Sequence, residues 1–177
     1  MLLGYLAMGI LGQAKMATAN LKKTSIRVPM AGIEVSNSPD ALETLLGSCV
    51  GIALWCRETQ RGALAHAMLS ESRGEVQQPG RFVDSAIATM LDTLAKKGAR
   101  RRALVAKLCG GSNMFKGTAN TQDVGRRNIE KAQEILRSLR IPILAEHVGG
   151  NAGRVIHFDL ETGRIQVKIG REVVAEI

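Results

Sequence analysis

The sequence is poor in aromatic residues and in cysteine. Phe, Trp and Tyr make up 3% of the 177 residues, so the core must be built from Val, Ile, Leu, Ala and Met. The three cysteines, Cys49, Cys56 and Cys109, are an odd set without C-x-x-C spacing. That spacing argues against a disulfide framework and against a structural zinc site. These absences fit one globular domain in a reducing cytoplasm.

Negative charge is also scarce, since 24 basic residues face 16 acidic ones and the net charge is +8. Such a surface attracts acidic partners at low ionic strength. Basic residues cluster at Lys96 to Arg102 and at Arg126 to Lys131. Nucleic-acid binding is an alternative interpretation, but the clusters lack the interleaved aromatic residues of a single-strand binder. Cations at the end of an amphipathic helix are the favoured explanation of the first cluster.

The one long apolar segment, Met1 to Gly12, is too short to span a membrane. It also lacks the basic start of a signal peptide, because Lys15 follows the apolar segment. We expect translation to begin at Met16, so that residues 1–15 are an extension and residues 16–177 form a single domain. A short anchor at a membrane surface is the alternative.

Hydrophobic periodicity predicts an α+β fold. Because the order is not a strict alternation of strand and helix, we expect mixed β-sheets forming a central sandwich with helices packed outside. The expected strands are Thr24 to Met30 at an edge, Ile33 to Val35, Cys49 to Arg57 in a central position, Ala63 to Leu69, Ala103 to Leu108, Ile143 to Val148, and a hairpin of Val155 to Asp159 with Ile165 to Ile169; the expected helices are Phe82 to Lys97 and Val124 to Arg140.

Cys49 follows two small residues, Gly47 and Ser48, at the mouth of an expected strand. Small residues allow close approach of a substrate or of another backbone, so Cys49 is a candidate nucleophile. Spacing alone favours the simpler alternative, a cysteine that packs as a small hydrophobic residue. His66 is placed among apolar neighbours on the next strand, where most histidines are core residues. Antiparallel pairing across a short turn would nevertheless bring His66 toward Cys49.

A second small-residue segment runs from Gly110 to Phe115. Its glycines could turn the backbone so that amides, including that of Gly111, face an oxyanion, or could hold Asn113 in a special conformation. A plain turn from strand to loop is equally compatible with the sequence. Neither this segment nor Gly149 to Gly153 has the strand-to-helix context of a phosphate-binding loop.

Several motifs together resemble the chemoreceptor glutamine deamidase family, CheD. The resemblance extends from about Ile26 to Ile169. The motifs are Leu46 to Val50, Gly62 to Leu69 with His66, Gly110 to Phe115 with Asn113, Arg127 with Asn128, Ile141 to Glu146, Val148 to Arg154, and Phe158 to Gly163.

The resemblance implies a cysteine amidohydrolase that converts receptor glutamines to glutamate and releases ammonia. It assigns the nucleophile to Cys49 and the histidine to His66. Aligned without a gap, the family's threonine falls on Glu43, and Thr44 lies one residue closer to Cys49. A one-residue shift in a strand reverses the side-chain face. We expect Thr44 to be the third catalytic residue, aimed by a local bulge if necessary.

The mechanism implied by the resemblance needs no metal and no organic cofactor. Substrate binding or oxyanion stabilisation is expected from the Cys49 amide and from Gly47, Ser48, Gly111 and Asn113. The implied partners are the cytoplasmic helices of methyl-accepting chemotaxis receptors and a CheC-type phosphatase. Two alternatives remain: a non-catalytic adaptor that binds receptor or phosphatase, and a cysteine hydrolase aimed at another protein.

Overall fold

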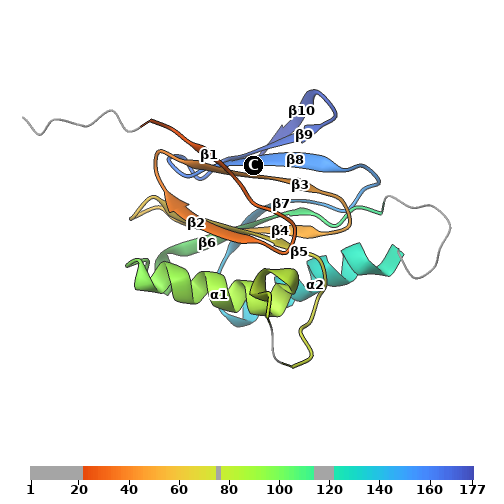
Figure 1. Cartoon of the computed structure of the whole chain (residues 1–177), viewed down its shortest axis with the longest axis horizontal. Helices are drawn as coiled ribbons and strands as arrows, with labels where there is room; N and C mark the ends of the chain where they lie inside the picture. The colour runs from red at the N-terminus through yellow and green to blue at the C-terminus, as the bar shows by residue number, and fades with distance from the viewer. Residues whose placement is uncertain (1–21, 75–76, 114–121) are drawn as a thin grey trace, which may run out of the picture.

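The computed structural model describes residues 22–74, 77–113 and 122–177, and it consists of three layers (Figure 1). Two mixed sheets lie face to face, and two helices cover the outer face of one of them. This arrangement confirms the expected α+β fold with helices outside the sheets. The proposed extension of residues 1–15 lies outside the described residues.

The sheet farther from the helices, sheet A, has the order β1-β3-β8-β9-β10. The sequence predicted β1 at an edge and the antiparallel β8–β9 hairpin, and both are confirmed. It missed β3 and β10, because it named no strand between Val35 and Cys49 and none after Ile169. The bounds are β1 Ser25–Arg27, β3 Ala41–Leu46, β8 Arg154–Asp159, β9 Ile165–Ile169 and β10 Glu172–Glu176.

The middle layer, sheet B, has the order β2-β5-β4-β6-β7. The apolar strand β4 is central, as its sequence predicted, and it pairs antiparallel with both β5 and β6. Only β7 runs parallel to its neighbour, because α2 connects it to β6. The bounds are β2 Ile33–Asn37, β4 Val50–Cys56, β5 Arg61–Ala67, β6 Leu104–Gly110 and β7 Ile143–Val148.

Helices α1, Val83–Lys96, and α2, Gln122–Ser138, pack on the outer face of sheet B (Figure 1). The apolar stripe of α1 is fully buried except for the partly buried Leu91, which confirms the amphipathic helix read from the sequence. Gly98 follows α1 with a φ of +86°, the left-handed conformation that ends many helices. Short 3-10 turns at Pro79–Arg81 and Arg101–Ala103 flank the α1 segment. Within the described ranges, no helix is long and apolar enough to cross a membrane.

The two faces of sheet B contribute to two different cores. On β4, Val50, Ile52 and Leu54 face the helices, whereas Ala53 and Trp55 face sheet A. This alternation follows from the two-residue repeat of a strand. Side chains on the same face of sheet B as Ala53 therefore lie between the two sheets, where the candidate site is found.

Candidate active site

Cys49 lies one residue before β4, on the face of sheet B that meets sheet A. Its side chain is partly exposed and packs against the core between the sheets. The other two cysteines are fully buried. A thiol must be reachable to act as a nucleophile. Among the three cysteines, Cys49 alone meets that condition.

His66 lies on β5, and its Cα pairs with that of Gly51 on β4. Cys49 precedes Gly51 by two residues and therefore projects from the same face of the sheet. Residues in this diagonal relation on neighbouring strands are within side-chain reach of each other. The antiparallel pairing of β4 and β5, expected from the short turn between them, is confirmed.

Thr44 projects from β3 of sheet A and contacts His66 of sheet B, so the pair bridges the two layers. Its Oγ1 lies 2.8 Å from His66 Nδ1 and 2.8 Å from the carbonyl oxygen of Val28. Thr44 and His66 are 4% and 5% exposed. Glu43 is half-buried and points to the opposite face of β3, where its carboxylate lies 3.9 Å from His157. Thr44 thus reaches the histidine, and Glu43 does not.

These contacts determine the tautomer of neutral His66. The Thr44 hydroxyl has one hydrogen, and the Val28 carbonyl can only accept, so the hydroxyl donates to Val28. Thr44 Oγ1 must then accept the hydrogen on His66 Nδ1. The imidazole consequently carries its proton on Nδ1 and leaves Nε2 as an unprotonated base.

Burial acts on the ionisation of both members of the Cys49–His66 pair. It raises the pKa of the Cys49 thiol, and a hydrogen bond from the Cys49 backbone opposes this only in part. It lowers the pKa of His66 below the ordinary histidine value. Both shifts favour uncharged groups. The resting site at neutral pH therefore holds a thiol beside a neutral imidazole.

The backbone before Cys49 offers hydrogen-bond donors. Among the described residues, no acceptor pairs with the backbone N–H groups of Gly47 and Ser48, and Cys49 N–H interacts with its own sulfur. The N–H of Gly111, by contrast, donates to the Cys49 carbonyl at 2.8 Å. The free amides thus lie on the Cys49 loop itself, and the Gly111 amide is already engaged.

The second small-residue segment holds the Cys49 loop in place. Ser112 N–H donates to the Gly47 carbonyl at 2.9 Å, and Asn113 N–H donates to the Gly150 carbonyl at 2.8 Å. At Gly110, which has a φ of +92°, a Cβ would lie 2.4 Å from the Cys49 carbonyl oxygen. Gly110 is therefore required for this close approach. Met114 and Phe115 of the same motif lie outside the described residues.

Asn128 on α2 is a site residue whose role the sequence reasoning did not identify. Its side-chain amide donates to the Met68 carbonyl at 2.9 Å and to the Ser48 carbonyl at 3.4 Å. Both partners are acceptors, which identifies the nitrogen as the atom facing them. Ser48 C=O and Cys49 N–H belong to one planar peptide unit and point in opposite directions. By holding this carbonyl, Asn128 also orients the Cys49 N–H.

Three buried polar atoms around the Cys49 loop have no hydrogen-bond partner within the described ranges. They are Ser112 Oγ, Asn113 Oδ1 and Asn128 Oδ1. Folded proteins seldom leave buried polar atoms unpaired, and each exception calls for an explanation such as a catalytic role or a bound water. In the same part of the chain, no cluster of His, Cys, Asp or Glu could hold a metal ion.

An accessible thiol, a buried imidazole with a free Nε2 and a hydroxyl that fixes its tautomer are the arrangement of a cysteine-dependent hydrolase. Comparisons with known proteins agree with this class. The family model described as "CheD chemotactic sensory transduction" matches residues 68–169. The chain therefore belongs to the CheD family.

Relatives from an archaeon and a bacterium match most of the chain. The "Probable chemoreceptor glutamine deamidase CheD" of Methanococcus vannielii is 42% identical over 84% of this chain and 97% of its own length. The protein of the same name from Clostridium botulinum is 41% identical over 81% of this chain and 91% of its own length. Neisseria meningitidis protein NMB0706, described as family DUF152, shows a distant structural likeness, with a TM-score of 0.37, 14% identity, and coverage of 67% of this chain and 52% of that chain.

Proposed function

We propose that this protein is a protein-glutamine deamidase that converts glutamines of chemoreceptor signalling helices to glutamate and releases ammonia. The observation that carries the proposal is the Thr44–His66 hydrogen bond, which leaves His66 Nε2 free as a base on the same sheet face as Cys49. The names of the relatives supply the substrate class.

The first half of the reaction forms a thioester. His66 Nε2 accepts the thiol proton while Cys49 Sγ attacks the carbonyl carbon of the glutamine side chain. The negative charge that develops on the amide oxygen is stabilised by the Cys49 N–H with the neighbouring Ser48 or Gly47 N–H. The imidazolium then protonates the amide nitrogen, the C–N bond breaks, and ammonia leaves.

The second half regenerates the enzyme. His66, neutral again, takes a proton from water, and the resulting hydroxide attacks the thioester carbonyl. Cleavage of the C–S bond releases glutamate, and the imidazolium returns its proton to Cys49. Every proton is accounted for by the Cys49–His66 pair, and the Thr44 hydroxyl holds the imidazole in one orientation throughout.

Two of the predicted site residues contribute differently in this proposal. Gly111 supports the Cys49 carbonyl, because its amide is engaged there, and it is not an oxyanion donor. Asn113 offers its unpaired Oδ1 to the substrate amide, which requires an acceptor. The adaptor alternative depended on a misdirected Thr44, and the Thr44–His66 bond removes that reason for preferring it.

The substrate places the protein in the cytoplasm, with the cytoplasmic helices of chemotaxis receptors as its principal partner. A CheC-type phosphatase is a second proposed partner, suggested by the family. The net charge of +8 supports association with acidic helical surfaces.

Incubation with a purified receptor cytoplasmic domain, followed by intact-mass analysis and peptide sequencing, tests the deamidase. Wild-type protein should raise the receptor mass at defined glutamines, and Cys49→Ala and His66→Ala should not. His157→Ala is the matched control, since His157 lies on β8 with its side chain against Glu43. Receptor that binds wild-type protein without any mass change would favour the adaptor.

A further inference from the structure

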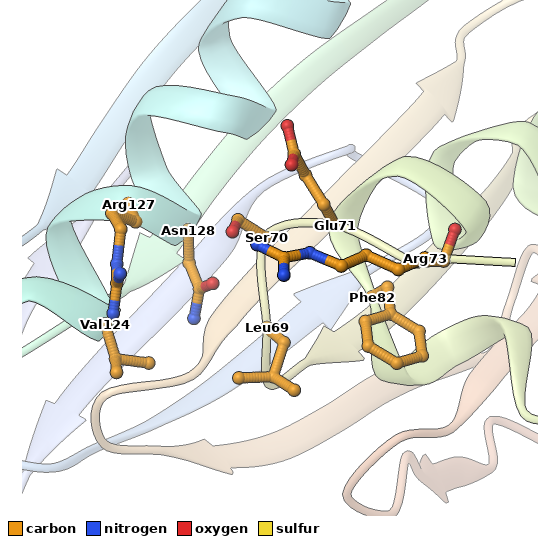
Figure 2. A pocket seen from close by; sticks show the side chains of 9 residues that line it. Leu69, Ser70, Glu71, Arg73, Phe82, Val124, Arg127 and Asn128 are labelled. Carbon is orange, nitrogen blue, oxygen red and sulfur yellow. The ribbon is translucent and has the colours of Figure 1, made fainter.

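The protein has a cavity of about 440 Å³ with Asn128 in its lining (Figure 2). Its walls are the segment that follows β5 and the first turns of α2. The residues that line the cavity include Ser70, Glu71, Arg73, Phe82, Arg127 and Asn128.

Asn128 connects the wall of the cavity to the loop that carries Cys49. The amide of this residue contacts the carbonyls of Ser48 and Met68. Ser48 immediately precedes the nucleophile, and Met68 lies two residues after His66, just past the end of β5. A substrate side chain in the cavity would therefore lie next to Asn128, which contacts the backbone of the Cys49 loop.

Two arginines and one glutamate are the charged residues of the lining. Arg73 extends across one side of the cavity near Ser70 and Phe82, and Arg127 stands on the opposite wall (Figure 2). The carboxylate of Glu71 is compensated by Lys131 at 2.7 Å. Within residues 22–74, 77–113 and 122–177, Arg73 has no carboxylate partner. The amino-terminal end of α2 adds the positive end of a helix dipole.

The segment that carries Arg73 is anchored. Ser72 donates from its backbone N–H to both Asp84 oxygens, at 3.1 and 3.0 Å, and its hydroxyl donates to the same carboxylate at 3.0 Å. Asp84 lies in the first turn of α1, so the segment is fixed to a helix. A guanidinium on a fixed backbone loses less freedom when it binds an anion.

Helix geometry indicates which substrate residue reaches the cavity. On a helix, residues three or four positions apart lie on one face, with Cβ atoms about 5–6 Å apart. A receptor helix that presents its glutamine to Cys49 thus presents a neighbour, one turn away, to the adjoining cavity. Arg binds carboxylates through a planar fork of two donors.

We infer that this cavity is a specificity subsite, in which Arg73 binds the carboxylate of an acidic residue one helical turn from the target glutamine. The inference rests on the proposed deamidase function and names the feature by which that site selects its glutamines. It assigns Arg73 a role in binding and none in the chemical steps.

The test uses the receptor cytoplasmic domain after its modified glutamines have been mapped. Arg73→Glu should raise KM about tenfold for a glutamine with an acidic neighbour one turn away, because a paired charge becomes a repelling one, and should leave kcat unchanged. Exchanging that neighbour for Lys in the receptor should impair wild-type protein and restore Arg73→Glu. Arg171→Glu is the matched control, an equal charge change on the exposed β9–β10 turn.

The outcomes separate the two proposals. If wild-type protein modifies no receptor glutamine, the deamidase function fails and the subsite with it. If wild-type protein is active but Arg73→Glu has the KM of Arg171→Glu, or the Lys exchange gives no rescue, the deamidase stands and the subsite is wrong.

Discussion

The molecule contains two places where a cysteine and a histidine meet on neighbouring strands, and only one has the properties of a catalytic pair. Cys49 and His66 lie diagonally across β4 and β5, whereas Cys109 and His147 are direct register partners on β6 and β7. Proximity of the two residue types is therefore not what distinguishes an active site.

Access separates the two thiols. Cys49 is partly exposed, and burial raises its pKa against an opposing backbone hydrogen bond. Cys109 is fully buried, and burial raises its pKa to about 12 despite the nearby Arg154. A thiol of that kind is inert at neutral pH.

The tautomers of the two histidines also differ. Arg154 Nη1 lies 2.7 Å from His147 Nδ1, and because a guanidinium only donates, this ring nitrogen accepts. Neutral His147 therefore carries its proton on Nε2, whereas His66 carries it on Nδ1 and keeps Nε2 free. Burial, assisted by Arg154, lowers the pKa of His147. The comparison teaches that the partner on the far side of the ring decides whether a histidine can act as a base.

The largest expected effect on activity distinguishes the alanine variants of the two cysteines. Cys49→Ala should abolish glutamine conversion, since it removes the thiol that attacks the substrate amide. Cys109→Ala should keep most of the activity and lower the free energy of unfolding by about 1–2 kcal/mol, because it removes one buried atom and leaves a small void. Receptor mass analysis and chemical denaturation measure the two quantities. Equal loss of activity in both variants would contradict the assignment of Cys49 as the nucleophile and of Cys109 as an inert thiol.

Removal of the tautomer-fixing group should have the next largest effect. Thr44→Val keeps the shape but loses the acceptor for His66 Nδ1–H, so kcat should fall roughly 10- to 100-fold, a part of the 10²- to 10⁴-fold that a general base contributes. Thr44→Ser restores the hydroxyl and should recover most of the rate. Glu43→Gln, on the opposite face of the same strand, serves as the control. A kcat in Thr44→Val equal to that of the control would contradict the assignment of Thr44.

A smaller loss is expected from Asn128→Ala, which frees the Ser48 carbonyl and with it the direction of the Cys49 N–H. We expect kcat to fall about tenfold, less than the 10²- to 10³-fold lost when an oxyanion donor is deleted outright. KM should change little. Gln133→Ala is the control, because Gln133 lies on the same helix as Asn128 and loses only an exposed hydrogen bond to Glu146 of β7. A drop in stability with unchanged kcat would mean that Asn128 supports only the fold.

The smallest effect is a displacement of the pH profile. Because His66 must be neutral to accept the thiol proton, kcat/KM should decline as the pH falls through the pKa of His66. Burial lowers that pKa, so the midpoint should lie below the ordinary histidine value of about 6.5. Because the His66 pKa is lower in the folded chain, the unfolded chain binds more protons once the pH falls below about 6.5. The free energy of unfolding should therefore also decline as the pH falls from that value toward the lowered pKa of His66. A midpoint above the ordinary value would show that His66 is charged in the resting enzyme.

Much of the architecture followed from the sequence, because strong periodicity specifies elements locally. The stripe of α1, the apolar strand β4 and the short turn from β4 to β5 predicted a helix outside the sheets, a central strand and an antiparallel strand pair. Strand β3 was missed because it pairs with β8, more than a hundred residues away in the chain. Strand β10 was missed because its residues are mostly exposed and carry little hydrophobic signal.

The sequence by itself determined the residue types of the site and the strands that carry Cys49 and His66. Only the tertiary structure decided which residue completes it. Whether Thr44 or Glu43 faces His66 depends on the phase of β3 relative to a different sheet, and a shift of one residue would reverse it. Asn128 reaches Ser48 only because α2 packs over the end of β4 and β5. Contacts between layers depend on how elements distant in sequence are stacked, and local periodicity carries no information about that stacking.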